Sequence, residues 1–468
     1  MHLSITLSTF PALVLIVLLY HLSKGQLIPV VMFLSIFQAA SVVNISVGGQ
    51  TIDITPSYLV VFATLFRGLI RKRVPMRAIW QSDMFAVRIL TLFGAYAVLS
   101  AMAFPVLFEG VPISNPRLGA DVPLHWNMSN MTQLFYLLCS LSFFAVASFK
   151  TSNAELATSV RWFVSGAFTA AVLLIYQWVG FRTGIPFPRT FFSTSTTYSL
   201  YDAYDIDGFT RVNGTFPEAS TAAFTMAIGL SLVLWRLLSG RITVANIAIA
   251  VTMITGLVLT LSTTGYLCFG YLLLVSSAVY LARWKGGAGA RALKLLLALP
   301  MLVICLAVLV STETRIALTK RVESVVLSKT DSASYRDRTR LDEKALSVAT
   351  STWLLGAGWG SCRASSFVAS ALGNVGIPGV LLFSVFCWTV LKPVTRINHL
   401  RVPLHGGVLI ALGSALLSLL ISVPEANHPV MWLLFAIAAK LNQKAGRPRP
   451  TYECKVGLDD KPASFACV

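Results

Sequence analysis

Long apolar runs follow one another along almost the whole chain, separated by short polar connections. A helix needs about 20 largely apolar residues to cross a hydrocarbon layer roughly 30 Å thick. By that measure the sequence predicts an all-α, polytopic membrane domain over residues 1–442, with about 12–13 transmembrane helices and a large external loop that carries short helices. The predicted spans are 3–22, 27–44, 55–70, 84–105, 131–149, 160–181, 219–235, 243–262, 264–282, 293–311, 367–391, 405–423 and 427–441.

The first run, 3–22, has no basic segment before it and no small-residue cleavage site after it. We therefore expect a retained helix and not a signal peptide. Composition supports the membrane interpretation, because 56% of the residues are hydrophobic and only 12% are charged. A water-soluble domain could not hide so much apolar surface, which excludes the soluble globular classes.

Lys and Arg gather in alternate connections between the spans, for example in 71–77, 236–241 and 392–401. Short loops rich in positive charge stay in the cytoplasm, so we expect a cytoplasmic tail over 443–468 and an external N-terminus. The net charge of +18 then follows from loop orientation and from attraction to anionic membrane lipids, and we expect no nucleic-acid partner. Three long loops face the outer side in this topology: 106–130, 183–218 and 312–366.

Almost no ionisable side chain lies near the middle of a predicted span, which argues against an ion-coupled transporter. A flippase for lipid-linked glycans would need a cationic cavity within the helices. A channel or receptor would need charge rings along a pore or a sensor domain. The apolar runs show neither a cationic cavity nor such charge rings, and no sensor domain is visible. A flippase and a channel or receptor are therefore the less favoured alternatives, and the external loops are the better place to look for function.

The external loop 183–218 ends in a segment that leads directly into a span. Gly214 permits a backbone conformation that other residues avoid, so Arg211 is held by a tight turn where it can meet an anionic headgroup. Glu218 is either the acidic partner of a helix start or a catalytic carboxylate. In the same loop Asp202, Asp205 and Asp207 could in principle chelate a divalent cation.

Acidic clusters in loops rich in Tyr and Ser are usually solvated, so we expect no metal site here. The seven cysteines show neither metal-ligand spacing nor a disulfide framework, and no cofactor-binding motif is present.

The external loop 312–366 is the most highly charged segment of the chain. Ser334 and Asp337 fit a capping box, which predicts the start of a helix. On that helix Arg336 and Arg340 fall on one face, one turn apart, where two guanidinium groups can grip a phosphate or pyrophosphate. The alternative is a solvated helix whose arginines pair with neighbouring carboxylates.

Three glycines at alternate positions, Gly356, Gly358 and Gly360, follow this helix and indicate an irregular backbone of close approach. Arg363 and Ser366 come next, at the predicted membrane boundary. No strand precedes the glycines, so the segment is not a nucleotide-binding loop.

The order of these motifs resembles that of the O-antigen polymerase and O-antigen ligase superfamily of bacterial envelope glycosyltransferases. The resemblance spans residues 211–379. Its motifs are Arg211-x-x-Gly214-x-Phe216-x-Glu218, a Leu-Ser-Thr-Thr-Gly265 hairpin, a Ser334-Tyr-Arg336 helix, a glycine-rich stretch that leads to Arg363, and Asn374-x-Gly376-x-x-Gly379.

The resemblance implies a GT-C-like enzyme of the bacterial inner membrane that polymerises undecaprenyl-pyrophosphate-linked oligosaccharide repeat units into exopolysaccharide or O-antigen at the outer face. The transfer would be inverting and metal-independent. Carried onto this chain, Arg211 and Arg336 would clamp the pyrophosphate, where negative charge develops. The implied partners are the lipid-linked glycan donor and acceptor, membrane lipids, a chain-length regulator and other polysaccharide assembly proteins.

Ligases of this superfamily carry a histidine late in the long external loop, and this chain has none between His125 and His399. We therefore favour a polymerase over an O-antigen ligase that transfers glycan to a lipid A core. Glu218, Glu425 and His428 are left to deprotonate or orient the acceptor, although His428 could simply be an interfacial or capping residue.

The positions of these residues and the resemblance together predict a catalytic set and a substrate-binding set of residues. The predicted catalytic residues are Arg211, Glu218, Arg336 and Arg340. The predicted substrate-binding residues are Asn213, Arg363, Ser366 and His428.

Overall fold

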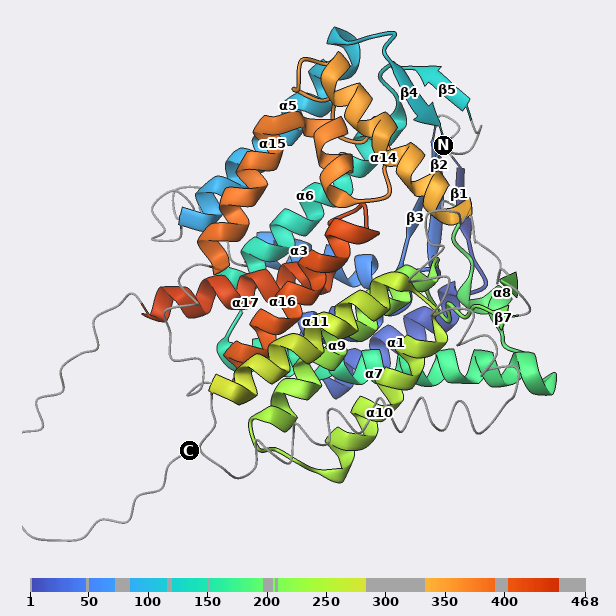
Figure 1. The fold of residues 1–468 in the computed structure, drawn as a ribbon, viewed down its shortest axis with the longest axis vertical. Helices are drawn as coiled ribbons and strands as arrows, with labels where there is room; N and C mark the ends of the chain where they lie inside the picture. The colour runs from blue at the N-terminus through green and yellow to red at the C-terminus, as the bar shows by residue number, and fades with distance from the viewer. Residues whose placement is uncertain are drawn as a thin grey trace, which may run out of the picture.

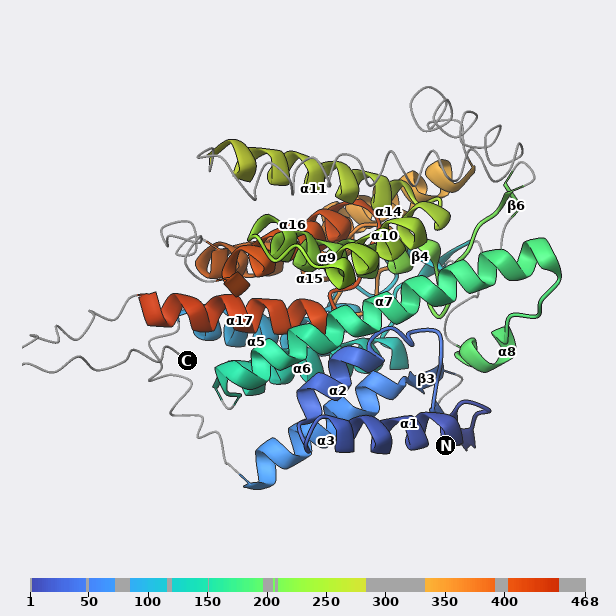
Figure 2. The same cartoon turned by 90° about the horizontal axis from the view of Figure 1, so that it is seen from below.

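The described part of the chain forms a bundle of helices with three small antiparallel sheets, and Figures 1 and 2 show how these elements are arranged. In both views the strands and α14 lie toward one end of the bundle, and the C-terminal end of α17 lies at the other. The computed structural model describes residues 2–47, 50–71, 85–115, 120–149, 151–196, 205–206, 209–282, 333–391 and 403–445.

The helices before the 283–332 gap are α1 (Thr9–Leu22), α2 (Leu27–Leu34), α3 (Pro56–Arg71), α5 (Phe85–Leu107), α6 (Met128–Phe149), α7 (Asn153–Thr183), α8 (Arg189–Phe192), α9 (Ala219–Leu238), α10 (Val244–Leu259) and α11 (Thr263–Ala282). Those after it are α14 (Ala333–Ser351), α15 (Phe367–Leu391), α16 (Pro403–Ile421) and α17 (Pro429–Ala445).

The strands pair in chain order. The first sheet contains β1 (His2–Ile5), β2 (Val43–Val47) and β3 (Gln50–Ile54), with Ile5 opposite Val43 and Val43 opposite Ile54. Two hairpins complete the set: β4 (Pro112–Asn115) with β5 (Ala120–Pro123), and β6 (Asp205–Ile206) with β7 (Phe209–Thr210).

Among the described residues, five helices are long and apolar enough to cross a membrane: α5, α6, α7, α9 and α15. Shorter apolar helices join them in α1, α10, α11, α16 and α17. The prediction of a mostly helical chain is therefore confirmed, with five described helices long and apolar enough to cross a membrane, and the count of about 12–13 spans stays a prediction.

The centre of the bundle is α9, most of which is buried between α7, α10, α11 and α16. Small residues let these helices approach closely. A side chain added at Gly229 of α9 would meet the Ala167 methyl group on α7 at 2.8 Å. Close approach at small residues is how helices pack where no water drives their association.

A ladder of hydroxyl groups on α16 ties this helix to its neighbours. Ser414 lies 3.0 Å from Ser231 of α9, and Ser418 lies 3.1 Å from the thiol of Cys268 on α11. One turn further, Ser422 lies 2.5 Å from Thr264. All these groups are buried, so each is paired where an unpaired hydroxyl would be costly.

The structure corrects two predicted spans. The span 27–44 is wrong as a helix, because α2 ends at Leu34 and the chain then runs through turns and irregular backbone to β2. In this stretch the Ala39 N–H donates to Thr215 (3.0 Å), and the Ala39 carbonyl accepts from Ser195 (3.0 Å). The span 3–22 is helical only from Thr9, since its first residues form β1. The all-α prediction therefore missed the sheets.

The loop helix α14 begins at Ala333, so Ser334 lies within its first turn and the predicted cap before the helix is wrong. The predicted span 293–311 lies outside the described residues. Of the predicted tail 443–468, only residues up to 445 are described, and they form the end of α17.

Candidate functional site

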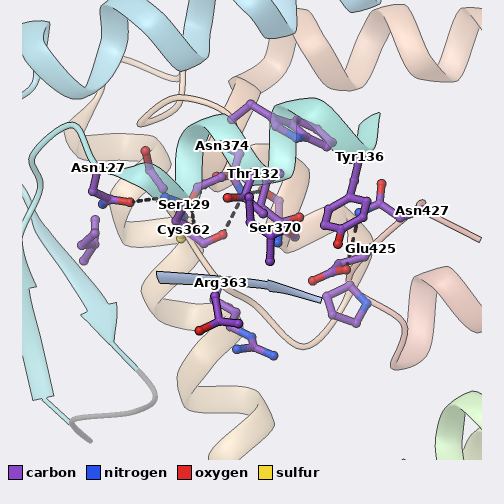
Figure 3. Close-up of a pocket in the computed structure, with 18 of the residues that line it drawn as sticks. Asn127, Ser129, Thr132, Tyr136, Cys362, Arg363, Ser370, Asn374, Glu425 and Asn427 are labelled. Atoms are coloured by element: carbon purple, nitrogen blue, oxygen red, sulfur yellow. Dashed lines mark hydrogen bonds between the residues drawn. The ribbon is translucent and has the colours of Figure 1, made fainter. Parts of the chain in front are cut away.

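A polar cleft of about 380 Å³ lies where β3, the β4–β5 hairpin and the start of α6 meet the glycine-rich loop and the turn before α17. Figure 3 shows Asn127 and Ser129 toward one end of the cleft and Tyr136, Glu425 and Asn427 toward the other. The polar side chains that line it come from Thr51, Asp53, Thr55, Tyr58, Ser114, His125, Asn127, Ser129, Thr132, Gln133, Tyr136, Ser361, Cys362, Arg363, Ser370, Asn374, Glu425 and Asn427.

One wall of the cleft is the glycine-rich loop, which docks against a break in α15. The break lies at Gly376, whose backbone (φ 59, ψ −165) is not helical. The N–H groups of Ala357 and Gly358 donate to the carbonyls of Gly373 and Asn374, both at 2.8 Å. The loop thereby satisfies carbonyl groups that an unbroken helix would have satisfied itself.

The glycines of this loop are required by its geometry. Gly358 has φ 101, and a side chain there would meet the Ser100 carbonyl of α5 at 2.7 Å. Gly360 has φ 86, and a side chain there would meet the Ser129 carbonyl of α6 at 2.9 Å. The prediction of an irregular backbone that closely approaches neighbouring elements is confirmed.

Two buried asparagines fix the loop. Asn130 of α6 donates to the Trp359 carbonyl (2.9 Å) and to the Ser361 hydroxyl (2.7 Å). Asn374 of α15 pairs with both backbone groups of Cys362. The residue that follows, Arg363, is thus carried on a rigid support, with its side chain exposed at the cleft.

Carboxylates and tyrosines line the other walls of the cleft. Asp53 accepts from the hydroxyls of Ser195 (2.5 Å) and Thr196 (3.1 Å), and its carbonyl accepts from Tyr136 (2.8 Å). Tyr58 donates to the Asn427 carbonyl at 2.7 Å, which holds the turn that carries Glu425. Within the described residues no ion pair joins Arg363 to a carboxylate.

The Arg211 segment lies in a separate place, anchored on α7. The Gln177 side chain, buried in the C-terminal part of α7, accepts from the N–H groups of Asn213 (3.1 Å) and Gly214 (2.7 Å). Gly214 is left-handed (φ 60), as its role in the turn predicts. The Arg211 Nε donates to the Thr260 carbonyl at 3.0 Å, at the end of α10.

Two of the predicted site residues in this segment have structural partners. The buried Asn213 amide donates to the Phe216 carbonyl (3.0 Å), and its oxygen accepts from Gln177 (3.2 Å). Its polar atoms are thus engaged within the protein. Glu218 stands at the N-cap position of α9, half-buried, and accepts from the Ser220 hydroxyl at 2.9 Å.

The arginine helix α14 lies beside the cleft and packs on α15 and β4. Arg336 and Arg340 are both exposed on it, and no ion pair to either is found in the described part of the chain. The one carboxylate of α14 with a clear structural role is Asp342, whose oxygen accepts the N–H groups of Ser365 (2.7 Å) and Ser366 (3.2 Å). Buried Ser366 caps the start of α15.

His428 is the last residue before α17, and its ring packs on Phe224 with centroids 4.7 Å apart. Burial lowers the pKa of His428 to about 4, so the ring is neutral at pH 7. Burial likewise raises the pKa of the Cys362 thiol to about 12, so this cysteine stays protonated in the cleft wall.

The cleft therefore unites Arg363 and Glu425 of the sequence-based candidates, while its described lining leaves out Arg211, Asn213, Glu218, Arg336, Arg340, Ser366 and His428. Sequence reasoning missed Asp53, His125, Asn130, Tyr136 and Gln177. Only Gln177 gave a usable signal, as an amide within the predicted apolar span 160–181.

Chemically, the described lining of the cleft offers the guanidinium of Arg363, two carboxylates and many hydroxyl and amide groups. That set suits a ligand with an anionic group and several hydroxyls. The described residues contain no group of three or more His, Cys, Asp or Glu side chains placed to hold a metal ion. Asp202 and Asp207 of the possible acidic cluster lie outside the described residues.

Comparison with known proteins gives no assignment: no family model matches the chain, and no curated protein matches it.

Proposed function

We propose that this chain is a membrane-embedded glycosyltransferase that polymerises undecaprenyl-pyrophosphate-linked repeat units into exopolysaccharide or O-antigen. The observation that carries the proposal is the exposed Arg363, which has no ion pair to a carboxylate among the described residues, in a cleft lined by polar side chains at the strand-bearing end of apolar helices. A lipid-linked donor has an apolar tail, an anionic pyrophosphate and a hydroxyl-rich glycan. The apolar helices can contact the lipid tail, Arg363 can bind the pyrophosphate, and the polar side chains of the cleft can hydrogen-bond to the glycan.

Arg363 is the residue to which we assign the leaving pyrophosphate in this mechanism. As the anomeric bond breaks, negative charge grows on the phosphate oxygen, and a guanidinium placed there favours the transition state over the ground state. Arg336 and Arg340, which are exposed on α14, would bind the second phosphate of the pyrophosphate. Arg211, held beside α10, is retained as a second cationic site from the motif order.

The proposal includes a multi-pass location in the bacterial inner membrane, with about 12–13 spans in a GT-C-like arrangement and the cleft on the outer face. The proposed partners are the lipid-linked donor and acceptor, membrane lipids and a chain-length regulator.

The test uses the full chain in nanodiscs with a lipid-pyrophosphate-linked repeat unit, and products separated by size. A ladder of longer lipid-linked glycans is expected. Arg363→Ala should lower the rate by roughly 10²–10³-fold, as loss of one donor to a developing anion does elsewhere. Arg241→Ala, an exposed arginine between α9 and α10, is the matched control and should retain the ladder.

If no ladder of longer glycans forms, two further measurements distinguish a ligase from a flippase. Transfer only after addition of a lipid A core would make the chain a ligase. Movement of lipid-linked glycan between leaflets without any transfer would make it a flippase.

A further inference from the structure

One histidine lines the cleft, and neither the motif order nor the residue spacing had pointed to it. His125 lies between β5 and α6, with an exposed side chain. It comes from the external loop before α6, far in sequence from Arg363, and the fold brings both to the same cleft.

The backbone around His125 is firmly held. The preceding Leu124 is fully buried, and its N–H donates to the Val111 carbonyl at 2.8 Å. The Asn127 side chain donates to the His125 carbonyl (3.3 Å) and accepts from the Ser129 N–H (2.8 Å), at the start of α6. These bonds fix the backbone from which the ring of His125 projects.

The hydrogen bond of the ring defines its tautomer. The Nδ1 atom lies 3.0 Å from the Pro123 carbonyl oxygen. A carbonyl oxygen can only accept, so Nδ1 carries the proton in this bond. The neutral ring therefore presents Nε2 with a free lone pair, which is the form that accepts a proton.

The carboxylates that share the cleft are less available. Both oxygens of Asp53 accept hydroxyl hydrogen bonds, from Ser195 and Thr196. Glu425 lies toward the end of the cleft opposite Asn127 in Figure 3, with Asn427 3.5 Å from its oxygen. Arg363 lies between these ends and gives the cleft its positive charge.

We propose that His125 is the catalytic base of this site, an inference that rests on the proposed glycosyl transfer. The acceptor hydroxyl oxygen forms a bond to the anomeric carbon while the bond from that carbon to the phosphate oxygen breaks. The electron pair of the broken bond leaves on the pyrophosphate, which Arg363 holds. The hydroxyl proton passes to Nε2 of His125, and solvent at the exposed ring later removes it.

This assignment explains how the chain can do without the histidine that ligases carry in the long external loop. The base comes from a different loop and reaches the acceptor from the hairpin side of the cleft. Its Nδ1 bond spans only two residues, so substitution leaves the fold in place.

The experiment compares His125→Gln and His125→Ala with the wild-type chain in nanodiscs. Removal of the base should lower kcat by roughly 10²–10⁴-fold with little change in donor KM. Added imidazole should restore activity to His125→Ala, because it can enter the space that the ring leaves. Donor binding should be retained in both variants. His21→Gln, an exposed histidine on α1, is the control.

The outcomes separate the two proposals. If wild-type protein makes a ladder and His125→Gln keeps its kcat, the role of His125 is wrong and the polymerase stands. If imidazole fails to rescue a folded, donor-binding His125→Ala protein, the role as base is also wrong. If the wild-type chain transfers nothing to any acceptor, both proposals fall.

Discussion

The side-chain amide of Asn374 pairs with both backbone groups of Cys362: its oxygen accepts the Cys362 N–H at 2.9 Å and its nitrogen donates to the Cys362 carbonyl at 2.8 Å. Its nitrogen also donates to the Ser370 carbonyl at 2.7 Å within α15. One amide thus joins the broken helix to the loop that carries Arg363.

Asn374→Ala should destabilise the protein, because it leaves two buried backbone groups of Cys362 without partners. Each orphaned group costs about 1–3 kcal/mol. The thermal melting temperature of the purified chain measures the loss. Asn246→Ala, which removes an exposed amide bond to the Arg241 carbonyl, should leave the melting temperature nearly unchanged. Equal melting of the two variants would contradict the role of Asn374.

Gly376→Ala should prevent correct folding of the loop and helix. Its backbone lies in a region that only glycine populates, and an added methyl group would collide with the Leu354 carbonyl. Gly110→Ala is the matched control: φ is also positive (89), but open space surrounds the position, so only strain of about 1–2 kcal/mol is added. Yield of monodisperse protein should fall sharply for Gly376→Ala alone.

Gln177→Leu should release the Arg211 segment from α7. The substitution keeps the volume but leaves the N–H groups of Asn213 and Gly214 without an acceptor, at about 1–3 kcal/mol each. Gln177→Glu retains an acceptor and should melt between the wild type and Gln177→Leu. Limited proteolysis should cut Gln177→Leu near Arg211 first. A Leu variant that melts like the wild type would show that the amide does not hold the segment.

Stability should fall as the pH drops from 6.5 toward 4, in part because of His428. The folded pKa of about 4 lies below the ordinary value of 6.5, so in this window the unfolded chain binds the proton and the folded chain does not. The stabilisation is complete above pH 6.5. Melting temperatures measured across this range should show a smaller slope for His428→Gln. An unchanged slope would mean that the folded ring accepts a proton freely.

The helical part of the fold was predictable where hydropathy alone decides structure. Runs such as 219–235 and 367–391 correspond to α9 and α15, because a helix in an apolar setting satisfies its own backbone. The stretch after Leu34 was also predicted as part of a span, but its backbone pairs with Ser195 and Thr215. Hydropathy cannot detect partners more than a hundred residues away.

The candidate site was harder to predict for the same reason. Arg363 stood out by its charge after the glycines, whereas His125 and Asp53 are single polar residues in unremarkable loops. Their relevance comes only from the fold that brings three loops and a helix start to one cleft. The arginine spacing on α14 was predictable, but its start was placed too late because a local capping pattern was followed.

The break in α15 also bears on how the chain is made. Residues 354–358 leave the ribosome before the second half of α15, yet their backbone groups pair with Gly373, Asn374 and Ile377 across the break. The pairing across the break can therefore form only after the second half of α15 has been made and the earlier loop has folded back upon it.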